Sequence, residues 1–65
     1  MRLRKLRQER EGLSMGGFAK ILGIAPASYQ FYEYGKSMPR YEILLKIAEY
    51  FDTTPNYLLG VDDVP

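Results

Sequence analysis

The chain has 65 residues, enough for one domain with one small core, since a chain of this size buries only about 60% of its unfolded surface. It contains no cysteine and no histidine, so disulfides are excluded and the usual soft metal ligands, the commonest general base and the thiol nucleophile are missing. The net charge of +1 divides unevenly: residues 1–40 carry eight Lys or Arg against three Glu (+5), and residues 41–65 carry one Lys against five Asp or Glu (−4).

The sequence predicts five helices and no strand, and the first helix covers about residues 1–11. Leu3 and Leu6 lie three positions apart among good helix formers, which places them on one apolar face. Gly12 is expected to end this helix, because glycine readily adopts the left-handed conformation that follows a helix.

Two short helices follow, with Gly23 in the turn between them. The second helix is capped by Ser14, and its apolar face is expected to consist of Phe18, Ile21 and Leu22. The third helix runs from about Pro26 to Tyr34, with proline in its first turn and Gly35 after its end. Its buried residues are expected to be Ile24, Tyr29 and Tyr32. Two such helices must cross steeply, so residues 14–35 are predicted to form a helix-turn-helix whose second helix can enter a major groove.

The fourth helix, over about residues 41–51, has the clearest amphipathic pattern of the chain. Its apolar stripe consists of Ile43, Leu44, Ile47, Ala48 and Phe51. Thr54 caps a short fifth helix that begins with Pro55 and carries Tyr57, Leu58 and Leu59. Gly60 ends it, and residues 61–65 are expected to form a frayed tail of the single domain, residues 1–65.

No apolar run approaches the roughly 20 residues of a membrane span, and the Arg-rich N-terminus lacks the apolar segment of a signal peptide. We therefore expect a cytoplasmic protein with no membrane association. No cofactor, no metal and no small-molecule substrate are expected.

Seven short motifs occur along the chain: Leu3-Arg4-Lys5-Leu6-Arg7, Gly12-Leu13-Ser14, Phe18-Ala19-Lys20, Leu22-Gly23-Ile24, Tyr32-Glu33-x-Gly35-Lys36 with Pro39, Leu44-Leu45-Lys46-Ile47-Ala48, and Tyr57-Leu58-Leu59-Gly60. In this order they resemble the lambda-repressor-like, or Cro/C1-type (XRE family), helix-turn-helix domains of transcriptional regulators. The resemblance covers nearly the whole chain. It implies a compact, all-α domain of five helices that binds double-stranded operator DNA, commonly as a homodimer on paired half-sites.

Carried onto this chain, the resemblance places the base-reading positions at Ala25, Pro26, Ala27, Ser28, Gln30 and Phe31. Gln30 can make paired hydrogen bonds with adenine, and Ser28 can bond a base or a phosphate. Ala27 and Phe31 can offer only apolar contact, which we expect to be with thymine methyl groups. Since this helix has no arginine for guanine, an A·T-leaning site with modest direct readout is predicted. The alternative is that Phe31 belongs to the core with Tyr29 and Tyr32.

The resemblance also implies phosphate contacts at two places. At the start of the second helix, Ser14 and Met15 can present backbone N–H groups to a phosphate, aided by the helix dipole; family members often have glutamine in place of Met15. The second group follows the third helix and consists of Tyr34, Lys36, Ser37, Arg40 and Tyr41. Each of these residues, and the basic N-terminal portion as a whole, is also compatible with an ordinary solvated surface.

Two further features concern structure. The resemblance implies that an arginine of the first helix pairs with Glu33 and braces the third helix, which is the reading helix. Arg7 is preferred for this role, because it follows Leu6 directly. One extra residue before Gly12 leaves Arg10 as a possible substitute. Gly16 and Gly17 stand inside the second helix, where each costs roughly 0.5–1 kcal/mol relative to alanine. Either packing of the apolar face holds this helix in place, or the glycines allow close approach to DNA or to another helix.

The leading hypothesis, which rests on the resemblance, is a sequence-specific DNA-binding regulator of bacterial or phage origin, of the phage or mobile-element repressor type, that occupies an operator. The alternative is a protein-interaction or dimerisation module with weak or no DNA reading, whose surface would be Tyr34, Met38, Tyr41, Tyr50 and Tyr57. An enzyme is not expected, because the serines are explained as cap and contact residues. Dimer contacts are expected near the C-terminus, where Tyr57, Leu58 and Val61 are either exposed to a twofold mate or part of the core.

Overall fold

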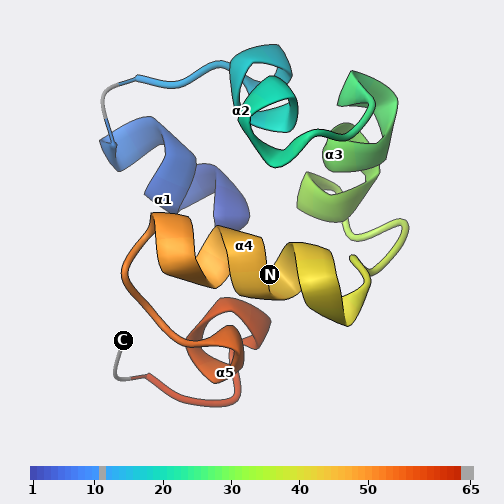
Figure 1. Cartoon of the computed structure of the whole chain (residues 1–65). Coiled ribbons are helices and arrows are strands. Elements are labelled where there is room, and N and C mark those ends of the chain that lie inside the picture. Colours follow the sequence, from blue (N-terminus) through green and yellow to red (C-terminus); the bar gives the residue numbers. More distant parts are fainter. Residues whose placement is uncertain (11, 64–65) are drawn as a thin grey trace.

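The computed structural model describes residues 1–10 and 12–63, and within them it has five helices and no strand (Figure 1). The helices are α1 (Leu3–Glu9), α2 (Met15–Leu22), α3 (Pro26–Glu33), α4 (Tyr41–Tyr50) and α5 (Pro55–Leu59). The prediction of an all-α fold with five helices is therefore confirmed. Among the described residues, no helix combines the length and the apolar character that crossing a membrane requires.

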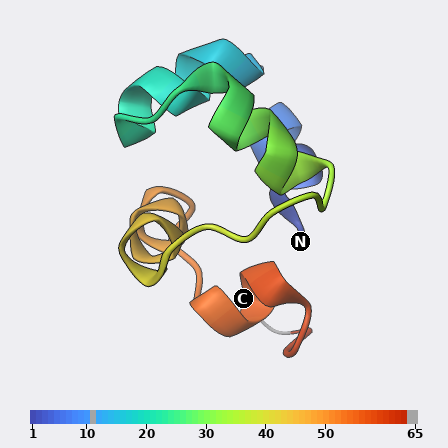
Figure 2. The same ribbon diagram turned by 90° about the vertical axis from the view of Figure 1, so that its right-hand side faces the viewer.

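The helices α2 and α3 lie together at one end of the molecule and α5 lies at the other, with α4 between them (Figures 1 and 2). Every helix contributes to one core, which consists of Leu3, Phe18, Ala19, Leu22, Tyr29, Leu44, Ile47, Ala48, Phe51 and Leu58. The ring of Phe18 is central, because its centroid lies 5.3 Å from that of Tyr29 and 5.1 Å from that of Phe51. This aromatic contact joins α2 to both α3 and the end of α4.

The first helix is shorter than predicted, since it begins at Leu3 and ends at Glu9. Before its start, Arg2 has a non-helical conformation, and its backbone N–H donates to the Leu58 carbonyl of α5 at 2.9 Å. Arg10 is already extended, and Gly12 therefore does not itself terminate the helix, although its φ of 63° is in the left-handed region. Glu11, the predicted last residue, lies outside the described residues.

The apolar face of α2 also needs a correction. Phe18 and Leu22 are buried as predicted, but Ile21 is 51% exposed and Ala19 is buried in its place. Ala19 therefore belongs to the core in place of Ile21. In α3, only Tyr29 is fully buried, while Ile24 and Tyr32 are partly buried against the edge of the core.

The turn between α2 and α3 depends on Gly23, which has φ 74° and ψ 31°. In this left-handed conformation its N–H donates to the Lys20 carbonyl at 3.1 Å, and the N–H of Ile24 donates to the Ala19 carbonyl at 3.0 Å. These two bonds satisfy carbonyl groups at the end of α2 and turn the chain sharply into α3. The predicted order of helix, glycine turn and helix is thus observed.

The two ends of the described chain lie side by side. The Arg2 guanidinium donates to the Asp62 carbonyl at 3.0 Å and to Asp63 Oδ1 at 2.8 Å, and it lies 4.3 Å from the centre of the Tyr57 ring. The Asp63 side chain is 95% exposed, so water screens this ion pair. Fraying of the tail over 61–65 stays a prediction, with Val64 and Pro65 outside the described residues.

Candidate nucleic-acid interface

An ion pair attaches α3 to α1. Arg7 Nε donates to Glu33 Oε2 at 2.6 Å, and Arg7 Nη2 donates to Glu33 Oε1 at 3.2 Å. The third nitrogen, Nη1, donates to the Leu13 carbonyl at 2.6 Å, just before α2. One guanidinium therefore joins α1, the entry to α2 and the end of α3. Arg10, the alternative partner, instead donates to the Phe51 carbonyl at 3.0 Å.

The surroundings of Glu33 keep its carboxyl group charged. Its side chain has 0% exposure, and such burial alone favours the neutral form. The hydrogen bonds and positive charge of Arg7 outweigh burial, so the pKa of Glu33 lies below its ordinary value. Burial, followed by the neighbouring Glu33 carboxylate, raises the pKa of the Tyr29 hydroxyl. The ion pair is thus a charged, mostly dry contact beneath the C-terminal end of α3.

The six predicted base-reading positions lie on the outer side of α3 and at its start. Ala25, Pro26 and Ala27 are exposed, and Ser28 and Gln30 are partly exposed. The Phe31 side chain is 47% exposed, so the alternative in which Phe31 is a core residue is wrong. Tyr29 is fully buried on the opposite side, which resolves how three nearby aromatic residues are accommodated.

The first group of predicted phosphate contacts lies at the start of α2. Ser14 is exposed, and its hydroxyl accepts a hydrogen bond from the Gly17 N–H at 2.9 Å, which is the predicted N-cap. The Met15 side chain is partly buried against the core. The exposed residues at this end of the helix are Ser14 and Gly16, both small, so a phosphate here would meet backbone N–H groups.

The second group of predicted phosphate contacts is exposed throughout and consists of Tyr34, Lys36, Ser37, Arg40 and Tyr41. The backbone N–H groups of Lys36 and Ser37 donate to the Phe31 carbonyl at 2.9 and 3.4 Å, so their side chains are what this loop offers to a ligand. No side chain caps the start of α4 at Arg40. The N–H groups of its first turn therefore add a second helix N-terminus beside this loop.

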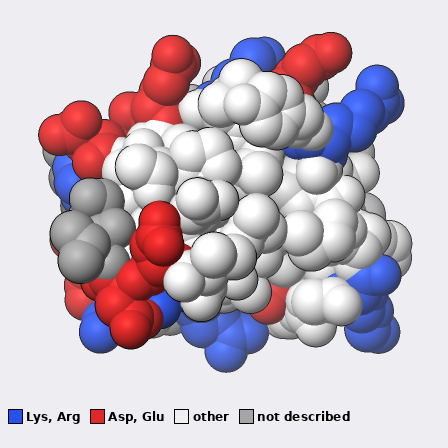
Figure 3. All heavy atoms as spheres, turned by 90° about the horizontal axis from the view of Figure 1, so that it is seen from below, with Lys and Arg blue, Asp and Glu red and all other residues white. Residues whose placement is uncertain are grey.

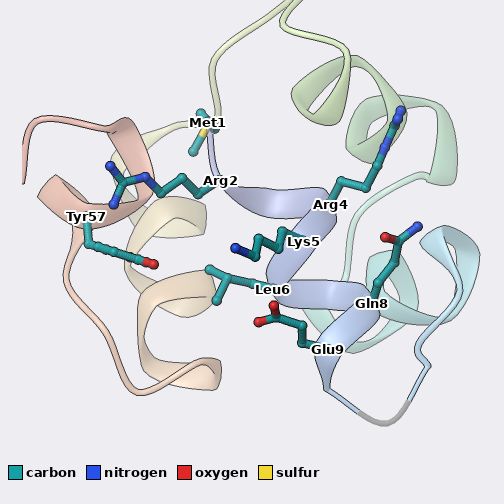
Figure 4. Close-up of a pocket in the computed structure, with 8 residues that line it drawn as sticks. All are labelled: Met1, Arg2, Arg4, Lys5, Leu6, Gln8, Glu9 and Tyr57. Atoms are coloured by element: carbon teal, nitrogen blue, oxygen red, sulfur yellow. The ribbon is translucent and has the colours of Figure 1, made fainter. Parts of the chain in front are cut away.

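One basic residue near α3 is missing from the predicted set. Arg4 lies three positions before Arg7, on the same side of α1, and its Nε is 3.6 Å from Glu33 Oε1. The i, i+3 spacing could have indicated this neighbour once Arg7 was paired with Glu33. Figure 4 shows Arg4 extending toward α3, while Arg2 extends toward Tyr57 on α5.

The predicted dimer and interaction residues have different environments. Leu58 is fully buried and belongs to the core, and Tyr57 is partly buried. Val61 is 71% exposed, and Leu59, which was not among the predicted dimer residues, is 37% exposed. The aromatic and methionine side chains proposed for a protein-interaction surface are exposed, apart from Tyr57: Tyr34, Met38, Tyr41 and Tyr50.

Comparison with known proteins identifies the family. A family model described as "Helix-turn-helix" matches residues 3–58. The chain belongs to this family, whose domains are of the Cro/C1 type. No solved structure matches the chain significantly.

Three curated relatives are HTH-type transcriptional regulators by name. The uncharacterized regulator YobD of Bacillus subtilis is 38% identical over 64 residues, which cover 98% of this chain and 56% of the relative. The regulator AnsR of the same organism is 42% identical over 59 residues, covering 91% of this chain and 50% of the relative. A putative regulatory protein of Pyrococcus abyssi is 45% identical over 51 residues, covering 78% of this chain and 16% of the relative. The chain thus spans about half the length of the first two relatives.

Proposed function

We propose that the protein is a sequence-specific DNA-binding transcriptional regulator that places α3 in the major groove of double-stranded DNA. One observation carries this proposal: α3 is held to the body by buried Tyr29 and Glu33, while Ala27, Gln30 and Phe31 on its other side stay accessible. A rigid helix with one free face is what base reading in a major groove requires. Membership of the helix-turn-helix family and the names of the relatives support the same function.

The proposed binding mode relies on phosphates for most of the affinity. Backbone N–H groups at the start of α2 contact one strand of the duplex, and the side chains of Lys36 and Arg40 contact the other side of the groove. Gln30, Ser28 and Phe31 then choose an A·T-leaning site. We propose a repressor of the phage or mobile-element type, acting in the cytoplasm by occupying an operator.

A homodimer is part of the proposal, because one short reading helix contacts few base pairs. Figure 3, which views the molecule from the α5 side, shows a broad uncharged surface bordered by charged side chains. Leu59 and Val61, at the end of α5, are exposed apolar residues suited to a twofold contact. Replacing both by serine should lower affinity for paired half-sites and leave affinity for a single half-site unchanged.

Selection of bound sequences from random duplex DNA tests the function directly. A palindromic, A·T-rich motif would support base reading by a dimer, whereas recovery of no preferred sequence would contradict it. A salt series on a random duplex separates this function from the protein-interaction module. A regulator that contacts several phosphates loses affinity steeply as salt rises, and an interaction module shows no DNA binding at any salt.

A further inference from the structure

Arg4 stands on the surface where α1 meets the C-terminal end of α3. Its side chain is 59% exposed, and its guanidinium carbon lies 5.9 Å from the centre of the Tyr34 ring. Tyr34, itself 51% exposed, follows α3 directly. Arg4 thus places a positive charge beside the end of the reading helix, although it comes from a different helix.

The positive charge of Arg4 is only partly neutralised by the neighbouring carboxylate of Glu33. Glu33 carries one negative charge and already accepts two hydrogen bonds from Arg7. Arg4 Nε, at 3.6 Å from the same carboxylate, is beyond hydrogen-bond distance. Arg4 thus forms an ion pair with Glu33 but, among the described residues, makes no side-chain hydrogen bond, and its 59% exposure leaves its donors within reach of a ligand.

We propose that Arg4 binds a DNA phosphate at the C-terminal end of α3, next to the position of Tyr34. This inference rests on the proposed function and adds a contact from α1 to the two groups at the start of α2 and after α3. The planar guanidinium can bind two phosphate oxygens at once, and the Tyr34 ring gives it a flat neighbour. Glu33 limits where the guanidinium can lie, because the carboxylate attracts it toward α3.

Lys5 provides a matched control. It follows Arg4 in α1, is exposed and carries the same charge. Both side chains line one pocket, but Lys5 extends toward the side of Tyr57 and α5, whereas Arg4 extends toward α3 (Figure 4). Replacing either residue by alanine changes the net charge equally. A difference between the two variants therefore reports position and not total charge.

The experiment measures binding of the whole chain to a fluorescein-labelled random duplex of about 20 base pairs, the length of two half-sites one helical turn apart. Fluorescence anisotropy over a salt series gives both affinity and salt slope. Arg4→Ala should weaken binding roughly three- to tenfold at about 0.1 M salt and reduce the slope by about 0.9, the value for one phosphate. Arg4→Lys should retain the slope, and Lys5→Ala should change it by less than half as much as Arg4→Ala does.

Equal slopes for Arg4→Ala, Lys5→Ala and the unmodified chain would overturn the assignment of Arg4. Equal reductions for the two alanine variants would also overturn it, because they would show a general charge effect. Absence of binding by the unmodified chain at every salt concentration would instead refute the proposed function. Thermal unfolding of each variant shows whether it is folded, and Arg4→Gln, which keeps more of the aliphatic stem, replaces the alanine variant if that one is not.

Discussion

Arg7 and Glu33, which lie 26 residues apart in the sequence, form a two-point ion pair that fixes α3 to α1. Their side chains are 10% and 0% exposed, so each buried charge is compensated by the other. Replacing one partner of such a pair leaves the other buried without compensation, which is more costly than losing a surface ion pair.

Glu33→Gln should therefore destabilise the domain by about 1–3 kcal/mol at neutral pH, measured by urea or thermal unfolding. The control is Glu49→Gln, because Glu49 is an exposed carboxylate on α4 for which the structure shows no ion pair among the described residues. It should change stability by less than about 0.5 kcal/mol. Equal stability of both variants would show that the ion pair does not brace α3.

The same pair predicts a pH dependence with a definite sign. The pKa of Glu33 is lowered by folding, so below the ordinary value of 4.5 the unfolded chain binds a proton that the folded chain does not. The stabilisation is complete above pH 4.5 and is lost as pH falls through the folded pKa. The difference in unfolding free energy between the unmodified chain and Glu33→Gln should be largest at neutral pH and shrink in acid. A difference that stays constant down to the acid limit would contradict this assignment.

The paired glycines of α2 should respond differently to alanine. A Cβ at Gly16 meets no atom within 4 Å, so Gly16→Ala should stabilise the domain by about 0.5–1 kcal/mol through helix propensity. A Cβ at Gly17 would lie 2.9 Å from Ser14 Oγ, the atom that caps the helix. Gly17→Ala should therefore gain less, or lose stability. Ser14→Ala removes that obstacle, so in this background both alanine variants should gain similar amounts by thermal unfolding.

DNA affinity of Gly16→Ala tests the role that sequence left open for these glycines. Lower affinity in a more stable protein would show that Gly16 keeps space for close approach of DNA. Unchanged affinity would show that its small size is not needed for binding.

Phe31 should read thymine methyl groups in the selected DNA site. Replacing thymine by uracil removes only the methyl group, which is worth about 0.8 kcal/mol when buried, or roughly fourfold in affinity. The unmodified chain should lose this amount for at least one thymine, and Phe31→Ala should bind both duplexes equally. If Phe31→Ala still distinguished thymine from uracil to the same extent, another side chain would be the reader.

Sequence reasoning was most successful where glycine or a cap residue fixes the local backbone. Ser14 and Thr54 cap their helices as predicted, and Gly23 makes the predicted left-handed turn. The prediction was wrong where two packings share one local pattern: around Phe18, both Ala19 and Ile21 suit an apolar face, and in the structure Ala19 is the buried one. Helix propensity likewise could not show the hydrogen bond from Arg2 to Leu58 of α5 that precedes α1.

The individual residues of the candidate site could be predicted from the sequence, but not all the contacts that join them across helices. The positions on α3 could be carried over one by one, because a helix-turn-helix has a fixed spacing between its two helices. Arg7 was preferred over Arg10 from the sequence, although the extra residue before Gly12 left the register open. In the structure Arg7 pairs with Glu33, and Arg10 donates to the Phe51 carbonyl. Arg4 was missed because its neighbour Tyr34 is distant in sequence.

The third hydrogen bond of Arg7, to the Leu13 carbonyl, gives this side chain a geometric role as well. Leu13 immediately precedes the proposed phosphate contact at the start of α2, and Glu33 immediately precedes the one at Tyr34. One guanidinium thus holds both places at a set separation. In the proposed complex, Arg7 therefore fixes the distance between the two phosphate contacts, and this distance has to match the separation of the two DNA strands across the major groove.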